Sequence, residues 1–129
     1  MQAVSSHMSR DLLTVAAELS LAEAAKRMAA RSVGAVIVFD GERLVGILTE
    51  RDILNAVAAE ATGKALVGDW MTRHPETIEA SDSTDHAAAL MIHGGFRHLP
   101  VVDGGETVGI LSIRDLMRVA LEDKSPRGA

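Results

Sequence analysis

The sequence has no cysteine and no tyrosine, and it contains only one tryptophan and two phenylalanines among 129 residues. The absence of cysteine excludes disulfide scaffolds, thiolate metal sites and cysteine nucleophiles. No apolar run approaches the ~20 residues that a membrane helix requires, and the N-terminal residues lack the basic and apolar regions of a signal peptide. We therefore expect a cytoplasmic protein with no membrane partner.

Positive charge is also scarce. The 13 lysines and arginines are outnumbered by 18 aspartates and glutamates, which gives a formal net charge of −5. Non-specific nucleic-acid binding relies on a basic surface, so we expect no nucleic-acid partner. A small anionic ligand is still compatible with this charge, because a few local donors suffice to bind it.

The motifs of common catalytic and metal sites are missing as well. The sequence has no G-x-S-x-G, no Walker Gly-Lys-Ser/Thr and no His-Glu-x-x-His motif. His86 and His93 lie seven residues apart on one expected helix, but no third ligand accompanies them. We therefore expect no enzymatic activity, no catalytic residues, no metal and no required cofactor.

The sequence instead contains an internal repeat. Gly46–Asp52 reads GILTERD and returns as GILSIRD at Gly109–Asp115, and 18 of the 51 residues in Val4–Leu54 recur in Val67–Met117. An internal repeat determines the architecture. A half of about 60 residues would be only marginally stable by itself, so we expect one module whose halves share a core.

Each half is expected to fold in the order strand, helix, strand, strand, helix, in a mixed α/β (α+β) class. The first half would have a strand at 12–16, a helix with a capping box of Ser20 and Glu23, strands at 35–39 and 44–49 around an Asp40-Gly41 turn, and a helix from 50 to about 60. The second would have a strand at 76–79, a helix from Ser81, Asp82 or Ser83 to Gly94-Gly95, strands at 98–102 and 107–112, and a helix from 113 to about 122. The strand runs are continuously apolar, which predicts that both faces of each sheet are covered.

Two turns carry the candidate chemistry. They are Thr49-x-x-Asp52 and Ser112-x-x-Asp115, each between a buried strand and a helix. This spacing is typical of a helix N-cap, in which a hydroxyl caps the helix and an acid three residues later answers it. The same turn presents free backbone N–H groups and the positive end of a helix dipole, which suit phosphate. A carboxylate in the first helical turn can also accept hydrogen bonds from a ribose diol.

Further short motifs accompany the two turns in matching order. They are Met8-Ser9, Val33–Val38, Met71-Thr72-x-x-Pro75-x-Thr77-Ile78 and Arg97–Asp103. This doubled pattern, over about residues 4–122, resembles a pair of cystathionine-β-synthase (CBS) domains, also called a Bateman module. The resemblance implies two tandem CBS domains related by a pseudo-two-fold axis, with the first at 1–62 and the second at 63–122. The residues after Glu122 include Ser125, Pro126 and Gly128, and we expect them to form a disordered tail at 123–129.

The resemblance also implies two clefts for adenosine-containing ligands, each built from both halves. The stronger cleft would contain Thr72, Thr77, Phe96, Arg97, His98, Thr49 and Asp52. The weaker cleft would contain Ser9, Thr14, Val33, Gly34, Ala35, Ser112 and Asp115. Arginine and histidine are suited to phosphate, and the weaker cleft has no such cation from its own strand. The adenine ring would lie on Val33, Val36 and Ile37 or on Phe96 and Leu99, although simple core packing accounts for these positions equally well.

The function implied by the resemblance is a regulatory module that senses AMP, ADP, ATP or S-adenosylmethionine, as in energy sensing. Family members of this kind pair as homodimers, and the response would pass to an unknown protein target. A ligand-free dimerisation or scaffolding module is the first alternative, and a nucleotide-processing enzyme is the second. Stabilisation by adenine nucleotides would separate the sensor from the scaffold, whereas turnover of ATP or AMP would identify an enzyme.

The difference between the two clefts generates a first prediction. Asp52→Ala should weaken nucleotide binding more than Asp115→Ala, because Asp52 belongs to the cleft that contains Arg97 and His98. A calorimetric titration of each variant with AMP measures the effect. Tighter AMP binding by the Asp52 variant than by the Asp115 variant would contradict the assignment.

Overall fold

The computed structural model describes residues 2–61 and 63–123, which belong to two compact units. The first-repeat unit is the contiguous segment Leu12–Pro75. The second-repeat unit combines the chain up to Asp11 with the chain from Glu76 onward. Each unit contains a sheet with helices packed on it, so the expected mixed α/β class is confirmed.

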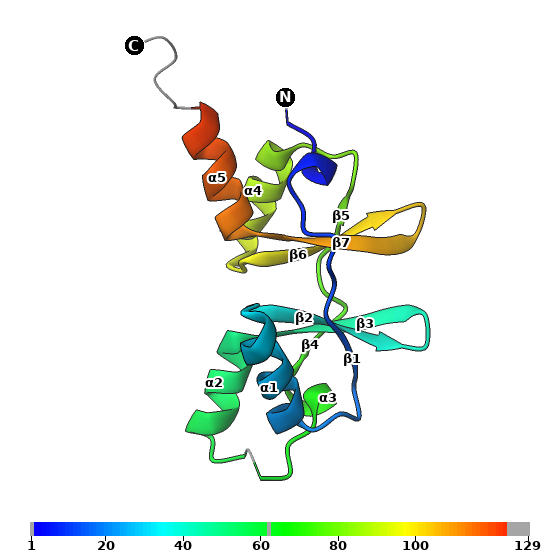
Figure 1. Ribbon diagram of the computed structural model, residues 1–129, viewed down its shortest axis with the longest axis vertical. Coiled ribbons are helices and arrows are strands. Elements are labelled where there is room, and N and C mark those ends of the chain that lie inside the picture. Colours follow the sequence, from blue (N-terminus) through cyan, green and yellow to red (C-terminus); the bar gives the residue numbers. More distant parts are fainter. Residues whose placement is uncertain (1, 62, 124–129) are drawn as a thin grey trace. The chain divides into compact units, whose positions relative to one another are not determined.

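The first-repeat unit has a four-stranded sheet in the order β1-β2-β3-β4. Its elements are β1 (Thr14–Ala16), α1 (Leu21–Arg31), β2 (Ala35–Asp40), β3 (Arg43–Thr49), α2 (Glu50–Ala58), α3 (Val67–Trp70) and β4 (Thr72–Arg73). Strand β1 pairs with β2 in parallel, and the other two pairings are antiparallel. Helices α1 and α2 lie on the same side of this sheet (Figure 1).

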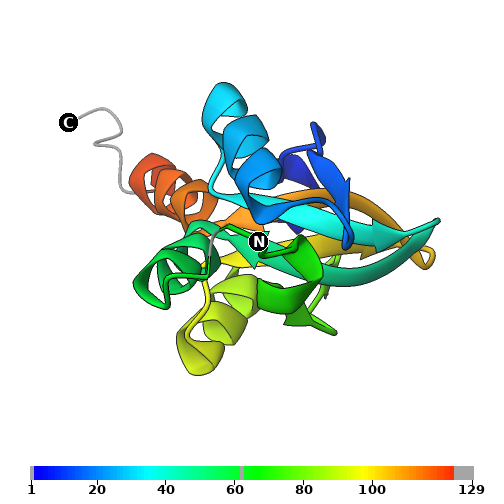
Figure 2. The same ribbon diagram turned by 90° about the horizontal axis from the view of Figure 1, so that it is seen from below.

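The second-repeat unit has a three-stranded sheet in the order β5-β6-β7. Its elements are the 3-10 turn η1 (Val4–Ser6), β5 (Ile78–Glu79), α4 (Thr84–Gly94), β6 (His98–Asp103), β7 (Glu106–Ser112) and α5 (Ile113–Asp123). Within each unit, the hairpin turn lies at the end of the strands away from the closing helix, α2 or α5 (Figures 1 and 2). The expected order of strand, helix, strand, strand, helix is therefore confirmed in both repeats.

The hairpins follow from their turn residues. In the first, Asp40 pairs with Arg43, which leaves a two-residue loop with Gly41 at φ 62°. In the second, Gly104 and Gly105 have φ values of 60° and 84°. Two-residue hairpins favour such positive φ values because their twist matches that of the strands. Strand β3 thereby returns beside β2 and ends at the Thr49 turn.

The helix ends also follow from local chemistry, with one correction. Ser83 caps α4 by accepting a hydrogen bond from the backbone N–H of His86, and Gly95 ends it in the left-handed conformation at φ 72°. Ser20 caps α1 in the same way. The reciprocal half of the expected capping box is wrong, because the Glu23 carboxylate pairs with Arg27, 3.2 Å away.

The opening segments of the two repeats are exchanged between the units. The segment around Met8 lies beside β7 of the second-repeat unit, where Ser9 and Ile110 exchange two backbone hydrogen bonds (Figure 1). In the first-repeat unit, Thr72 pairs with Ile47 of β3. Each segment therefore packs on the hairpin that belongs to the other repeat.

Glycines in β3 and β7 permit this close approach. A Cβ atom at Gly46 would lie 2.5 Å from the Met71 sulfur and 2.9 Å from the Thr72 carbonyl oxygen. A Cβ atom at Gly109 would lie 2.6 Å from the Met8 sulfur and 2.8 Å from the Ser9 carbonyl oxygen. Glycine is required where another backbone comes this near to a strand.

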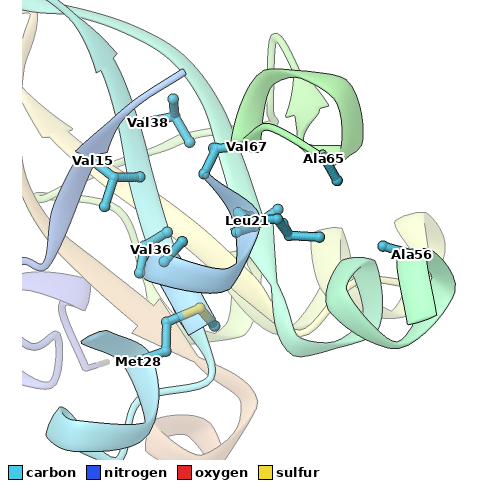
Figure 3. Packing of buried hydrophobic residues seen from close by; sticks show 10 residues of the cluster. Val15, Leu21, Met28, Val36, Val38, Ala56, Ala65 and Val67 are labelled. Atoms are coloured by element: carbon cyan, nitrogen blue, oxygen red, sulfur yellow. The ribbon is translucent and has the colours of Figure 1, made fainter. Parts of the chain in front are cut away.

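The buried apolar residues form two clusters, one in each unit. In the first-repeat unit, Leu21 and Met28 of α1 pack with Val36 and Val38 of β2 and with Val67 of α3 (Figure 3). In the second-repeat unit the cluster consists of Val4, Ile78, Ala80, Ala87, Met91, Leu99, Val101, Leu111 and Leu116. The exchanged segments contribute Val67 to the first cluster and Val4 to the second, so each cluster contains residues of both sequence repeats, and one core shared by the whole module stays a prediction.

The expected domain boundaries follow the two sequence repeats, whereas the two compact units divide the chain at other residues. The division into 1–62 and 63–122 stays a prediction, since the units change at Asp11 and Pro75. Residues Ala35–Val38 are all buried, as expected for strands covered on both faces. Helix α5 extends to Asp123, and the rest of the expected tail, 124–129, lies outside the described residues.

The exchanged segments generate a second prediction. Gly46→Ala and Gly109→Ala should each lower the free energy of unfolding by about 1–3 kcal/mol, because the added methyl group overpacks a backbone contact. Urea denaturation measures the change. Gly63→Ala is the matched control, since a Cβ there would meet no atom within 4 Å. Equal stability of all three variants would show that the close contacts at Gly46 and Gly109 do not affect the free energy of unfolding.

Candidate functional site

The Thr49 turn forms a complete capping box at the start of α2. The Thr49 hydroxyl accepts a hydrogen bond from the Asp52 backbone N–H at 3.4 Å. In return, Asp52 Oδ2 accepts hydrogen bonds from the Thr49 backbone N–H at 2.8 Å and from the Thr49 hydroxyl at 3.1 Å. Both side chains are partly buried, so the carboxylate is held in one orientation.

The Ser112 turn repeats this geometry at the start of α5. The Ser112 hydroxyl accepts from the Asp115 backbone N–H at 3.2 Å. Asp115 Oδ2 accepts from the Ser112 backbone N–H at 2.8 Å and from the Ser112 hydroxyl at 3.0 Å. The prediction of a helix cap is confirmed at both turns, and in both only Oδ1 of the aspartate faces away from the cap bonds.

The two aspartates differ at this outer oxygen. Asp115 Oδ1 accepts a hydrogen bond from Arg118 Nη1 at 3.1 Å. Within residues 2–61 and 63–123, Asp52 Oδ1 has no hydrogen bond or ion pair. The repeat places Asn55 where the second copy has Arg118, so this contrast follows from one substitution between the copies.

The strand beside each turn carries a different charge. In the first-repeat unit the Glu50 backbone N–H donates to the Gly34 carbonyl at 3.0 Å, and a Cβ atom on Gly34 would lie 3.1 Å from the Glu50 carboxylate. In the second-repeat unit Ile113 donates to the Arg97 carbonyl at 2.8 Å. The residue before β2 therefore lies beside a carboxylate, whereas the residue before β6 is an exposed arginine.

The smaller polar candidates lie on the segments that flank these sheets. Ser9 is bonded to Ile110 and is exposed. Thr14 begins β1 opposite Ile37, and Thr72 begins β4 opposite Ile47. Thr77 comes directly before β5 and is partly buried.

The apolar candidates are divided between cores and partly exposed positions. Val36, Ile37 and Leu99 are buried, and their role in an adenine wall stays a prediction. Val33 and Phe96 are partly buried against the same cores. The Phe96 ring also covers Gly94, where it occupies the space that a Cβ atom would need. Val33 and Phe96 are thus the apolar candidates with surface left to offer a ligand.

The structure brings some of the implied site residues together within one unit. Ala35 pairs with Thr49 in the β2–β3 ladder, and His98 pairs with Ser112 in the β6–β7 ladder. The implied clefts instead combine Arg97 and His98 with Asp52, and Gly34 and Ala35 with Asp115. Those groupings draw on residues of both units, and they stay predictions.

Two further properties bear on the class of protein. No helix in the described part of the chain combines the length and the apolar content that crossing a bilayer requires. Among the same residues, no three His, Cys, Asp or Glu side chains converge in a way that could hold a metal ion.

The chain belongs to the CBS domain family, whose model matches residues 4–59 and 67–122. A curated relative, an uncharacterised 17.7 kDa protein of Acidianus ambivalens, is 39% identical over 106 residues, which cover 81% of this chain. The chain spans 64% of that relative's length and 19% of the length of several CBS domain-containing proteins of Arabidopsis thaliana.

Solved structures of CBS pairs are similar over nearly the whole chain. The CBS domain protein PAE2072 from Pyrobaculum aerophilum, complexed with AMP, has a TM-score of 0.84 and 31% identity and covers 93% of this chain and 96% of its own. The CBS domain pair of protein MJ0100, in complex with 5′-methylthioadenosine and S-adenosylmethionine, has a TM-score of 0.89 and 28% identity and covers 96% and 99%. None of these relatives carries the name of an enzyme.

The sequence alone does not identify two side chains near the turns as part of the site. Glu50 and Arg118 were overlooked because their significance depends on where their side chains point. The available signal was disagreement between the copies, since Glu50 stands opposite Ile113 and Arg118 opposite Asn55 in the repeat. Both are also one helical turn or less from a motif aspartate.

The capping boxes generate a third prediction. Thr49→Ala and Ser112→Ala should each lower the free energy of unfolding by about 1 kcal/mol, because each loses the acceptor for a helix N–H. Chemical denaturation measures the loss. Thr49→Ser should retain most of the stability, because Ser112 caps the corresponding helix in the other copy. Ser81→Ala, on an exposed residue without a side-chain hydrogen bond in the described residues, is the control.

Proposed function

We propose that this protein is a regulatory binding module for adenosine-containing ligands and that it is not an enzyme. The proposal is supported by CBS-pair structures similar over more than nine-tenths of the chain, which hold AMP or S-adenosylmethionine and methylthioadenosine. Within this chain it is supported by two aspartates fixed by capping boxes, each with an oxygen turned away from the cap. Such an oxygen is suited to accept hydrogen bonds from a ribose diol.

The stronger site combines Thr49 and Asp52 with Thr72, Thr77, Phe96, Arg97 and His98. In this proposal Asp52 accepts the ribose hydroxyls and Arg97 contacts phosphate, because guanidinium groups form charge-assisted hydrogen bonds with phosphate oxygens. The exposed Arg97 guanidinium has no ion pair within the described residues. The ligands of this site are AMP, ADP or ATP.

The weaker site combines Ser112 and Asp115 with Ser9, Thr14, Val33, Gly34 and Ala35. The Glu50 carboxylate beside Gly34 opposes a phosphate group there, since like charges repel at short range. An uncharged or cationic adenosine compound suits this site better. S-adenosylmethionine, whose sulfonium is positively charged, is the ligand of this class that we propose for it.

The signal passes from ligand to partner through a change in conformational preference. A ligand that binds one arrangement of the protein more tightly shifts the population toward it. Exposed apolar side chains on the closing helices provide a surface for assembly: Leu54 and Val57 on α2, and Met117 and Leu121 on α5. We propose that they pair in a homodimer and that a further protein reads the ligand-bound state, as in energy sensing.

The same apolar surface favours a second candidate function. A dimerisation or scaffolding module would use the exposed leucine, valine and methionine side chains and would need no ligand. The two candidates differ in their response to nucleotide, because a ligand that binds only the native state raises its stability. At 100 times the dissociation constant this stabilisation is about 2.7 kcal/mol. No thermal shift at millimolar AMP, ATP or S-adenosylmethionine would favour the scaffold.

The charge contrast between the two strands generates a fourth prediction. Arg97→Gly, which installs the residue of the other copy, should weaken AMP binding roughly tenfold or more and leave adenosine binding nearly unchanged. Calorimetric titration with both ligands measures the two affinities. Arg31→Gly at the last residue of α1 removes the same charge elsewhere and serves as the control. Equal loss of AMP and adenosine binding would show that Arg97 does not act on the phosphate.

A further inference from the structure

The two motif aspartates, Asp52 and Asp115, differ in the number of hydrogen bonds that they can still accept. A carboxylate has about four lone-pair positions, two on each oxygen. In both turns Oδ2 already accepts two hydrogen bonds, one from the backbone N–H and one from the hydroxyl of the capping residue. Only Oδ1 is left to receive the two donors of a ribose diol.

At Asp115 this remaining oxygen is already in use. The hydrogen bond from Arg118 Nη1 is charge-assisted and leaves Oδ1 one further acceptor position. At Asp52 both positions of Oδ1 are open within the described residues, because the side chain three residues later is Asn55 and makes no such bond. The same ribose diol would therefore find two acceptors at Asp52 and one at Asp115.

We propose that Arg118 is a specificity-determining residue that competes with ribose for Asp115 and so makes the second turn the weaker adenosine acceptor. This inference rests on the proposed function, since it concerns the affinity of a site that must bind adenosine compounds. Arg118 acts by occupying the aspartate, and a ligand that engages Oδ1 fully must displace the guanidinium. Asn55 leaves the first turn without this competitor.

The size of the effect follows from the exposure of the pair. The Arg118 side chain is 64% exposed and that of Asp115 is 14% exposed, so the ion pair is partly open to solvent. Exposed pairs of this kind are weak, and their loss corresponds to roughly a two- to fivefold change in an equilibrium constant. Salt screens such pairs strongly, because the Debye length falls to about 3 Å at 1 M ionic strength. Competition by Arg118 should therefore fade at high salt.

A contrasting role for Arg118 is direct contact with a ligand phosphate. That role predicts weaker AMP binding when the arginine is removed. Competition predicts the opposite sign, and it predicts an effect on adenosine, which has no phosphate. Adenosine is therefore the probe that separates the two roles.

The experiment exchanges the residues that differ between the copies. Arg118→Asn is made in an Asp52→Ala background, so that adenosine binding reports the Asp115 turn, and should tighten adenosine binding two- to fivefold at low salt. The gain should disappear in 1 M NaCl. Arg114→Asn is the matched control, because it removes the same charge from the same helix without breaking a described ion pair.

The reciprocal variant tests the Asp52 turn, and its result does not depend on whether the Asp52→Ala variants fold. Asn55→Arg, in an Asp115→Ala background, should weaken adenosine binding at the Asp52 turn by a similar factor. Circular dichroism and a melting curve establish that each variant is folded.

The outcomes separate this inference from the function on which it rests. If adenosine and AMP bind the unaltered protein but neither exchange changes adenosine affinity, or Arg118→Asn weakens it, competition by Arg118 is overturned and the binding function stands. If no adenosine compound binds the unaltered protein or any variant, both proposals fail. A gain that persists at high salt or is matched by Arg114→Asn also contradicts competition.

Discussion

The fold depends on the contact between a strand glycine and an incoming backbone. At Gly46 and at Gly109 the absence of a side chain lets the opening segment of the other repeat bond to the strand, with a methionine over the glycine. This contact fixes the exchange of segments, and the exchange brings Val4 and Val67 into the two cores. The same strands continue for three residues to the capped turns, so a contact made for packing also positions the candidate ligand groups.

The capped turns combine a structural and a binding role in one carboxylate. One oxygen of each aspartate is consumed by the cap, which holds the side chain still before any ligand arrives. Rigid placement lowers the entropy that binding would otherwise cost. The copies differ at the other oxygen, because Arg118 donates a hydrogen bond to it in one turn, and no hydrogen bond to it is found among the described residues of the other.

The repeated order of strands and helices was predictable because apolar periodicity and turn residues act over short distances. The local geometry of a turn or a helix end is determined by its own residues, as at Asp40-Gly41, Ser83 and Gly95. The exchange of opening segments was not predictable, since it depends on which strand glycine faces which backbone. The pairing of Glu23 with Arg27 in place of the cap was likewise not predictable, since both are exposed side chains with more than one possible partner. At the site, the capping boxes followed from spacing, whereas the Glu50 and Arg118 contacts required side-chain directions.

The exchange also imposes an order on synthesis. The unit formed by Leu12–Pro75 is one uninterrupted piece of chain and can pack as soon as it has been made. Ser9, in contrast, pairs with Ile110 of β7, which is translated about 100 residues later, a delay on the order of 10 s at ribosomal rates. The first-repeat unit is therefore complete along the chain before the second-repeat unit, whose opening segment pairs across most of the sequence.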